Sequence, residues 1–84
     1  MKQCMITFRS VTPAQRGESV LKRGGIDCSL QRTPRWMEEQ GCGYSLGIHQ
    51  QAVNETAMIL KKAGIAYRKI YIQEENGAFE EWQL

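Results

Sequence analysis

A short internal repeat constrains the fold of this chain more than any other feature. LKRGGI at residues 21–26 matches LKKAGI at residues 60–65, and each copy follows an amphipathic stretch and leads toward an apolar one. Basic residues followed by glycine are typical of a helix C-terminus, because cations stabilise the negative end of the helix dipole and glycine adopts positive φ without strain. The repeat therefore predicts two helix-to-strand units within 84 residues, which is the length of one domain.

The first helix is predicted over residues 13–23, between a start signal and the glycines of the repeat. Thr12 fits the N-cap position, Pro13 fits the first helical position, and Gln15 completes a capping box. The second helix is predicted over residues 50–64. Its apolar residues recur at helical spacing, which indicates one buried face.

Four segments are apolar or alternate between apolar and polar residues, as strands do. They are residues 4–9, 26–32, 42–48 and 67–72. The order strand, helix, strand, strand, helix, strand predicts an α+β, ferredoxin-like βαββαβ fold over residues 1–73. It would place two helices on one face of a four-stranded antiparallel sheet with strand order 4-1-3-2.

The C-terminal extension, residues 74–84, fits two conformations. Asn76-Gly77 could turn a hairpin that adds a strand, or the apolar residues after it could form a patch on a short helix. On the sheet face away from the helices, Ser45 and Gly47 would lie beside Met5. Such a flat face suits either a homodimer, to which the extension could also contribute, or contact with solvent.

Composition and motifs exclude several functions. The formal net charge is +2, which is too small to indicate nucleic-acid binding, and no apolar run approaches the length of a membrane helix. The N-terminus lacks the apolar region of a signal peptide, so a cytoplasmic protein is expected. Neither a phosphate-binding loop nor a cysteine spacing typical of zinc is present, and no cofactor or metal is predicted.

Cys42 is the candidate reactive residue among three cysteines. Cys4 and Cys28 share the inward phase of their strands and are interpreted as core residues. His49 belongs at the opposite end of the predicted sheet from Cys42, which argues against a Cys–His catalytic pair, and it is interpreted as a solvated or capping residue.

Cationic and polar residues are predicted to gather at the end of the sheet that carries Cys42. Those interpreted as stabilising a thiolate or a bound anion are Arg9, Arg16, Arg32, Arg35 and Thr12. Cations and a helix N-terminus lower the pKa of a thiol, and the thiolate is the reactive species. The residues interpreted as supporting Cys42 in its loop are Pro34, Trp36, Gly41 and Gly43.

The segment ITFRSVTPAQRGESVLKRGGID, the TPR sequence that follows it, and the Cys42-Gly43 step together resemble a family of small bacterial selenium/sulfur carrier-like proteins. The resemblance covers about residues 5–73. It implies that Cys42 carries sulfur or selenium as a persulfide or selenosulfide between donor and acceptor proteins. It also implies that the protein acts as a carrier rather than as a stand-alone enzyme.

The residues by themselves leave a second function open. The chain could be a homo-oligomeric module for binding or regulation, in which the same end of the sheet binds a small anion without covalent chemistry. Loss of sulfur loading in Cys42→Ser would favour the carrier, whereas an unchanged set of ligands and partners in this variant would favour the binding module.

Overall fold

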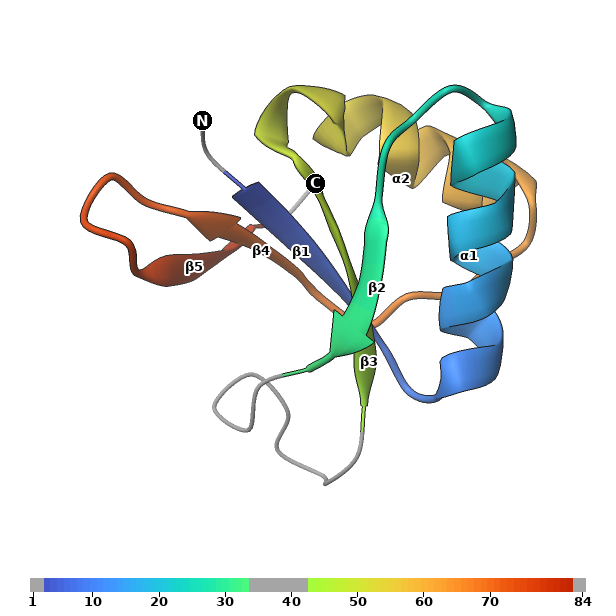
Figure 1. Cartoon of the computed structure of the whole chain (residues 1–84), viewed down its shortest axis with the longest axis horizontal. Coiled ribbons are helices and arrows are strands. Elements are labelled where there is room, and N and C mark those ends of the chain that lie inside the picture. Colours follow the sequence, from blue (N-terminus) through green and yellow to red (C-terminus); the bar gives the residue numbers. More distant parts are fainter. Residues whose placement is uncertain (1–2, 34–42, 83–84) are drawn as a thin grey trace.

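The computed structural model describes residues 3–33 and 43–82, although not the side chain of Trp82 (Figure 1). The helices lie together on one side of a twisted antiparallel sheet. The elements are β1 (Gln3–Phe8), α1 (Val11–Arg23), β2 (Ser29–Arg32), β3 (Tyr44–His49), the 3-10 turn η2 (Gln50–Ala52), α2 (Val53–Lys62), β4 (Ile70–Gln73) and β5 (Phe79–Trp82). No helix in these ranges is long and apolar enough to span a membrane.

The sheet has five strands in the order β2-β3-β1-β4-β5. The α+β class, the two helices and the antiparallel sheet are confirmed, but the four-stranded sheet was wrong, and the exact ferredoxin-like description is not confirmed. The fifth strand comes from the C-terminal hairpin. Asn76 accepts a hydrogen bond from Ala78 N at 3.0 Å and Gly77 has φ of 88°, so this turn returns the chain along β4.

The core lies between the helices and the sheet. Alternate residues of β1 point toward the helices, and Cys4, Ile6 and Phe8 are fully buried there. The helices contribute small and branched residues, which pack with the inward residues of β3 and β4. The other members of this cluster are Ala14, Leu21, Ile26, Leu46, Ile48, Val53, Leu60, Ile65, Ile70 and Ile72.

The internal repeat ends both helices in the same way. After α1, Ile26 N donates to Leu21 O at 2.9 Å, and Gly25 has φ of 83°. After α2, Ile65 N donates to Leu60 O at 3.0 Å, and Gly64 has φ of 71°. Each is a Schellman motif, in which a left-handed glycine lets the chain satisfy the last helical carbonyls, and the two flanking apolar residues are buried together.

Several element boundaries differ from those predicted. The first helix begins at Val11, with Ser10 in an extended conformation as N-cap and no side-chain capping bond, so the Thr12 capping box was wrong. Proline is tolerated throughout the first turn because those N–H groups have no intrahelical acceptor, so Pro13 did not fix the start. The segment predicted as a strand from residue 26 forms one only from Ser29, and Ile26 instead belongs to the Schellman motif that ends α1. The second helix opens with the 3-10 turn η2.

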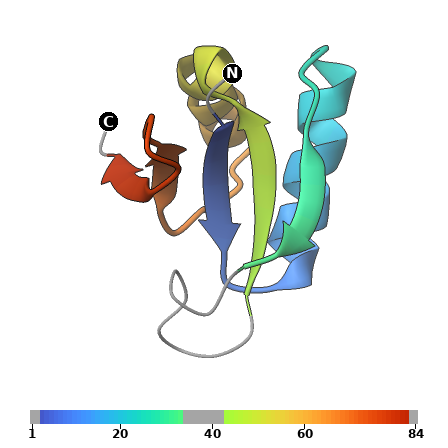
Figure 2. The ribbon, with the colours of Figure 1, turned by 60° about the vertical axis from the view of Figure 1, so that its left-hand side comes forward.

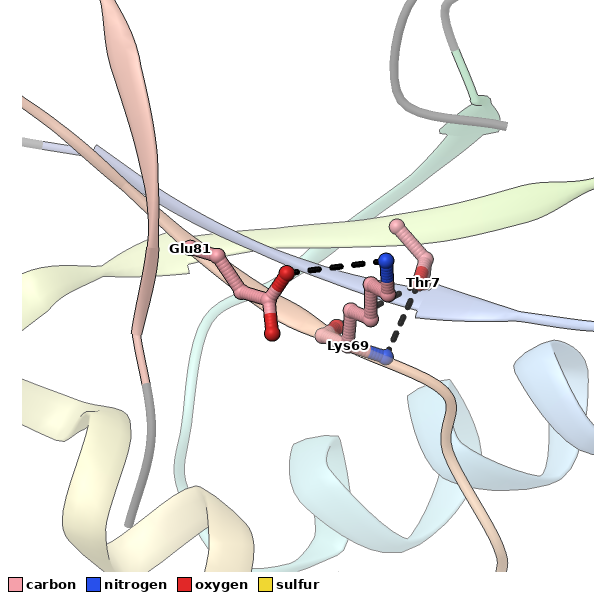
Figure 3. A network of polar contacts seen from close by, with 3 residues as sticks. All are labelled: Thr7, Lys69 and Glu81. Atoms are coloured by element: carbon pink, nitrogen blue, oxygen red, sulfur yellow. Dashed lines mark hydrogen bonds and ion pairs between the residues drawn. The ribbon is translucent and has the colours of Figure 1, made fainter. Parts of the chain in front are cut away.

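β4 begins at Ile70, three residues later than predicted, because the two residues before it lie opposite the single residue Thr7 of β1: Arg68 N donates to Thr7 O, and Thr7 N donates to Lys69 O, each at 2.8 Å. Lys69 N also donates to Thr7 Oγ1 at 3.1 Å (Figure 3). The Lys69 ammonium lies 3.5 Å from a Glu81 carboxylate oxygen, and this ion pair links β5 to the residue that precedes β4. A side-chain hydroxyl thus replaces one backbone acceptor where the chain enters the sheet.

The middle of the sheet face away from the helices is buried rather than solvated. Thr7 is 2% exposed and Ser45 is fully buried, although no described helix covers them. Longer side chains from neighbouring strands explain part of this burial. A Cβ built on Gly47 would lie 2.9 Å from Gln3 Nε2 and 3.1 Å from Gln31 Nε2, so these amides fold over the strand where a side chain is missing.

Candidate functional site

Four chain segments converge at one end of the sheet, as the strand directions predicted. β1 ends, α1 begins, β2 ends and β3 begins there (Figure 2). Tyr44, the first residue of β3, is paired with Phe8 of β1 on one side and with Arg32 of β2 on the other. The ends of these four elements therefore lie close to Thr33 and Gly43, the two residues that flank the segment 34–42.

A backbone hydrogen bond holds the base of that connection. Thr33 N donates to Gly43 O at 3.0 Å, and Gly43 is buried, so the ladder between β2 and β3 continues one step past its last strand pair. Thr33 Oγ1 is buried and has no hydrogen-bond partner among the residues that the structure describes. The predicted site residues that lie outside the described residues are Pro34, Arg35, Trp36, Gly41 and Cys42.

The three predicted arginines that the structure describes are exposed, and the strand register places Arg9 and Arg32 beside this base. Arg9 directly follows β1, Arg16 lies on the first half of α1, and Arg32 ends β2. Within the described ranges, none of the three side chains has an ion-pair partner. Thr12 is also exposed, in the first turn of α1. Among the described residues, this end of the sheet therefore presents positive charge without an ion-pair partner, beside a helix start at which Ser10 makes no side-chain capping bond.

The two described cysteines are poor nucleophiles. Cys4 is fully buried in β1, and burial raises the pKa of its thiol from 9.0 to about 12. Cys28 is partly buried with its Sγ 3.8 Å from the carbonyl oxygen of Glu18, to which it donates. Burial, followed by the nearby Glu18 and Asp27 carboxylates, raises the pKa of the Cys28 thiol as well. Both residues are therefore thiols at neutral pH.

The raised pKa of Cys4 predicts an alkaline loss of stability. Because the folded pKa lies above the unfolded one, the stabilisation is complete below pH 9 and is lost as the pH rises toward 12. Between pH 8 and 11 the free energy of unfolding should fall by about 2–3 kcal/mol more in the wild type than in Cys4→Ala. Urea denaturation at both pH values measures this difference. Equal falls in the two proteins would show that Cys4 does not titrate in this way.

At the opposite end of the sheet, Cys28 and His49 line the same hollow, which sequence reasoning missed. The sequence placed His49 at this end but not beside Cys28. The strand register explains this proximity. Ser29 pairs with Gly47, so Cys28, which precedes Ser29, lies near Ile48 and His49 at the end of β3. Within the described ranges, no three side chains of the His, Cys, Asp and Glu types are arranged to hold a metal ion.

Comparison with known families gives one match. The family described as "Putative Se/S carrier protein-like" matches residues 3–72 of the 84-residue chain. The chain belongs to this family. The match runs from the start of β1 into β4 and includes the segment that carries Cys42, whereas β5 lies beyond it. No curated protein and no solved structure matches the chain.

Proposed function

We propose that the protein carries sulfur or selenium on Cys42, as a persulfide or selenosulfide, between donor and acceptor enzymes of the cytoplasm. Membership of the Se/S carrier-like family supports the class of function. The observation that carries the assignment to Cys42 is the state of the other two cysteines. Burial raises the pKa of the Cys4 and Cys28 thiols and so disfavours their thiolates, which leaves Cys42 as the cysteine proposed to react as a thiolate.

The transfer step is a thiol–disulfide type of exchange. The Cys42 thiol first releases its proton to solvent, and the thiolate attacks the outer sulfur of a persulfide on the donor enzyme. A sulfur–sulfur bond forms on Cys42 while the donor's sulfur–sulfur bond breaks, and the donor cysteine leaves as a thiolate. The sulfur keeps its oxidation state, so no cofactor or external oxidant is required. Delivery to the acceptor repeats the same step in the other direction.

The neighbouring residues have supporting roles in this proposal. Arg9, Arg16, Arg32 and Arg35 provide positive potential that favours the thiolate and the anionic persulfide, and exposed charges act over about 10 Å at ordinary salt. The start of α1, including Thr12, adds partial positive charge. Pro34, Trp36, Gly41 and Gly43 support Cys42 in its loop, and Trp36 contacts the partner enzymes.

The test is sulfur loading followed by intact-mass measurement. The full chain is incubated with a cysteine desulfurase and cysteine, and its mass is measured before and after a reductant is added. The proposal predicts a gain of one sulfur atom per chain that the reductant reverses. The alternative function, a homo-oligomeric module that binds a small anion, predicts no gain in mass. An unchanged mass, with the desulfurase shown to be active on another acceptor, would therefore reject the carrier.

A further inference from the structure

The turn between β4 and β5 carries an Asn-Gly step. Asn76 and Gly77 lie at the tip of this hairpin, and both are exposed. Such a step is chemically labile in water, because the backbone nitrogen of the second residue can attack the side-chain amide of the first, and glycine has no side chain to hinder that approach. The chain has one other asparagine, Asn54 in α2, which precedes Glu55 instead of a glycine. The two positions therefore allow a comparison within one molecule.

A hydrogen bond of the turn positions the side-chain amide of Asn76. Ala78 N donates to Asn76 Oδ1 at 3.0 Å, so the carboxamide lies along the chain across Gly77. A donor on this oxygen makes the carbon beside it more electrophilic and stabilises the negative charge that develops on the oxygen during an attack. The geometry therefore favours a reaction at Asn76 Cγ.

The attacking group would be the backbone nitrogen of Gly77, which the folded turn restrains. This nitrogen donates to Glu74 O at 3.0 Å. The bond must open before the nitrogen can lose its proton, so the reaction requires brief opening of the turn. Such openings are frequent where few buried contacts hold the backbone, and residues 75–78 are all exposed.

Asn54 lacks these features although it is equally open to water. It is exposed like Asn76, but it lies in the first turn of α2. Closure of a ring between the side-chain carbon and the next backbone nitrogen needs a ψ angle far from the helical value of about −42°. The side chain of Glu55 also hinders the approach. Local geometry rather than exposure therefore distinguishes the two asparagines.

The pairing of β5 depends on the length of the main chain at this turn. Within the described sheet, β5 lies at an edge and pairs with β4 alone. Gln73 lies opposite Phe79 in the rung next to the turn, and Glu74 N donates to Ala78 O at 2.6 Å. An extra main-chain carbon in the turn would disturb this register. An extra negative charge would add repulsion, because residues 73–84 contain four glutamates and no lysine or arginine.

We propose that Asn76 is a site of spontaneous deamidation, and that the isoaspartate formed there releases β5 from β4. The modification needs no enzyme and no change of oxidation state, and it does not depend on sulfur transfer.

The reaction has two steps. In the first, the Gly77 nitrogen gives its proton to hydroxide and bonds to Asn76 Cγ, while the bond from Cγ to the side-chain nitrogen breaks and ammonia leaves with a proton from water. In the second, water opens the five-membered imide. Attack at Cγ gives aspartate with the original backbone. Attack at the main-chain carbonyl carbon gives isoaspartate, in which the chain runs through Cγ and is longer by one carbon.

The first test is peptide mapping of the full chain after prolonged incubation in mildly alkaline buffer. Trypsin cleaves after Lys69, so residues 70–84 form a peptide that holds Asn76 without Asn54. Its aspartate and isoaspartate forms should accumulate in proportion to the hydroxide concentration, and conversion of Asn54 should be roughly a hundredfold slower. An unchanged 70–84 peptide, or equal conversion at both asparagines, would overturn the proposal.

The second test measures amide hydrogen exchange in the isoaspartate form, purified from the incubated chain. The matched control is freshly purified Asn76→Asp, which carries the same added charge on an unaltered backbone. Residues 79–82 of β5 should exchange about tenfold faster in the isoaspartate form than in Asn76→Asp, whereas β1 should exchange equally in both. Equal exchange of β5 in the two proteins would show that isoaspartate does not release this strand.

A third measurement examines the restraint on the Gly77 nitrogen. The full chain unfolded in urea should deamidate at Asn76 severalfold faster than the folded chain at the same pH, because Glu74 O no longer holds the Gly77 N–H group. Equal rates would contradict the view that the reaction waits for the turn to open.

Discussion

Replacement of Cys42 by serine should abolish sulfur loading completely, whereas variants of the other two cysteines should load like the wild type. A serine hydroxyl cannot form a persulfide, so the reaction loses its nucleophile. Cys4 cannot substitute because it is fully buried with a pKa of about 12, and the pKa of Cys28 is also raised. Intact-mass measurement after incubation with a desulfurase distinguishes one added sulfur atom from none.

The matched controls are Cys28→Ser and Cys4→Ala. Alanine is preferred at position 4 because a serine hydroxyl there would be buried in the apolar core without an acceptor. Both controls should gain one sulfur atom, and both additions should be removed by reductant. Retained loading in Cys42→Ser, together with lost loading in Cys28→Ser, would move the carrier thiol to the opposite end of the sheet. It would also contradict the role proposed here for the arginines.

Truncation of Phe8 to alanine should lower the free energy of unfolding by about 3–5 kcal/mol. Phe8 is fully buried at the end of β1, where it faces the first helix. A Cβ on Gly17 of α1 would lie 3.4 Å from Phe8 Cζ, so the ring fills the space that this glycine leaves open. The variant loses the burial of the ring and gains a cavity that the sheet and α1 cannot close without moving.

The control for this change is Met58→Ala. Met58 lies on α2 and is 60% exposed, so its truncation should change stability by less than about 0.5 kcal/mol. Urea denaturation followed by circular dichroism measures both variants, and the dependence on urea should stay the same if the transition remains two-state. A loss of less than about 1 kcal/mol in Phe8→Ala would show that the end of the core near the candidate site is loosely packed.

The core and the candidate site are coupled by their position in the chain. Phe8 is the last residue of β1 and Arg9 follows it directly, while Tyr44 pairs with Phe8 and follows Gly43. The residues at the base of the 34–42 segment are thus placed by side chains that the core fixes. Substitutions of Phe8 should for this reason be judged by stability before any effect on loading is assigned to the site.

Local sequence determined the parts of this fold that depend on a few neighbouring residues. The repeated LKRGGI and LKKAGI segments predicted that a helix ends within each, although the second helix ends at Lys62 and not at residue 64, and each end proved to be a Schellman motif with a left-handed glycine. Alternation placed Tyr44, Leu46 and Ile48 on one face of β3, and these residues pack with the core. Strand directions then predicted that the ends of β1 and β2 meet the start of α1 and β3, as they do.

Only the tertiary structure decided the features that join distant residues. The extension, residues 74–84, was compatible with a hairpin strand or a short helix, and pairing of β5 with β4 selected the hairpin. The regular pairing of β4 with β1 starts at Ile70 because Arg68 and Lys69 both bond to Thr7, which lies about 60 residues away in the sequence. Cys28 and His49 share a hollow because the register of β2 on β3 brings them to one end of the sheet. Local patterns fix the phase and the ends of each element, whereas register and side-chain contacts depend on how the elements pack, and no short window of sequence contains that information.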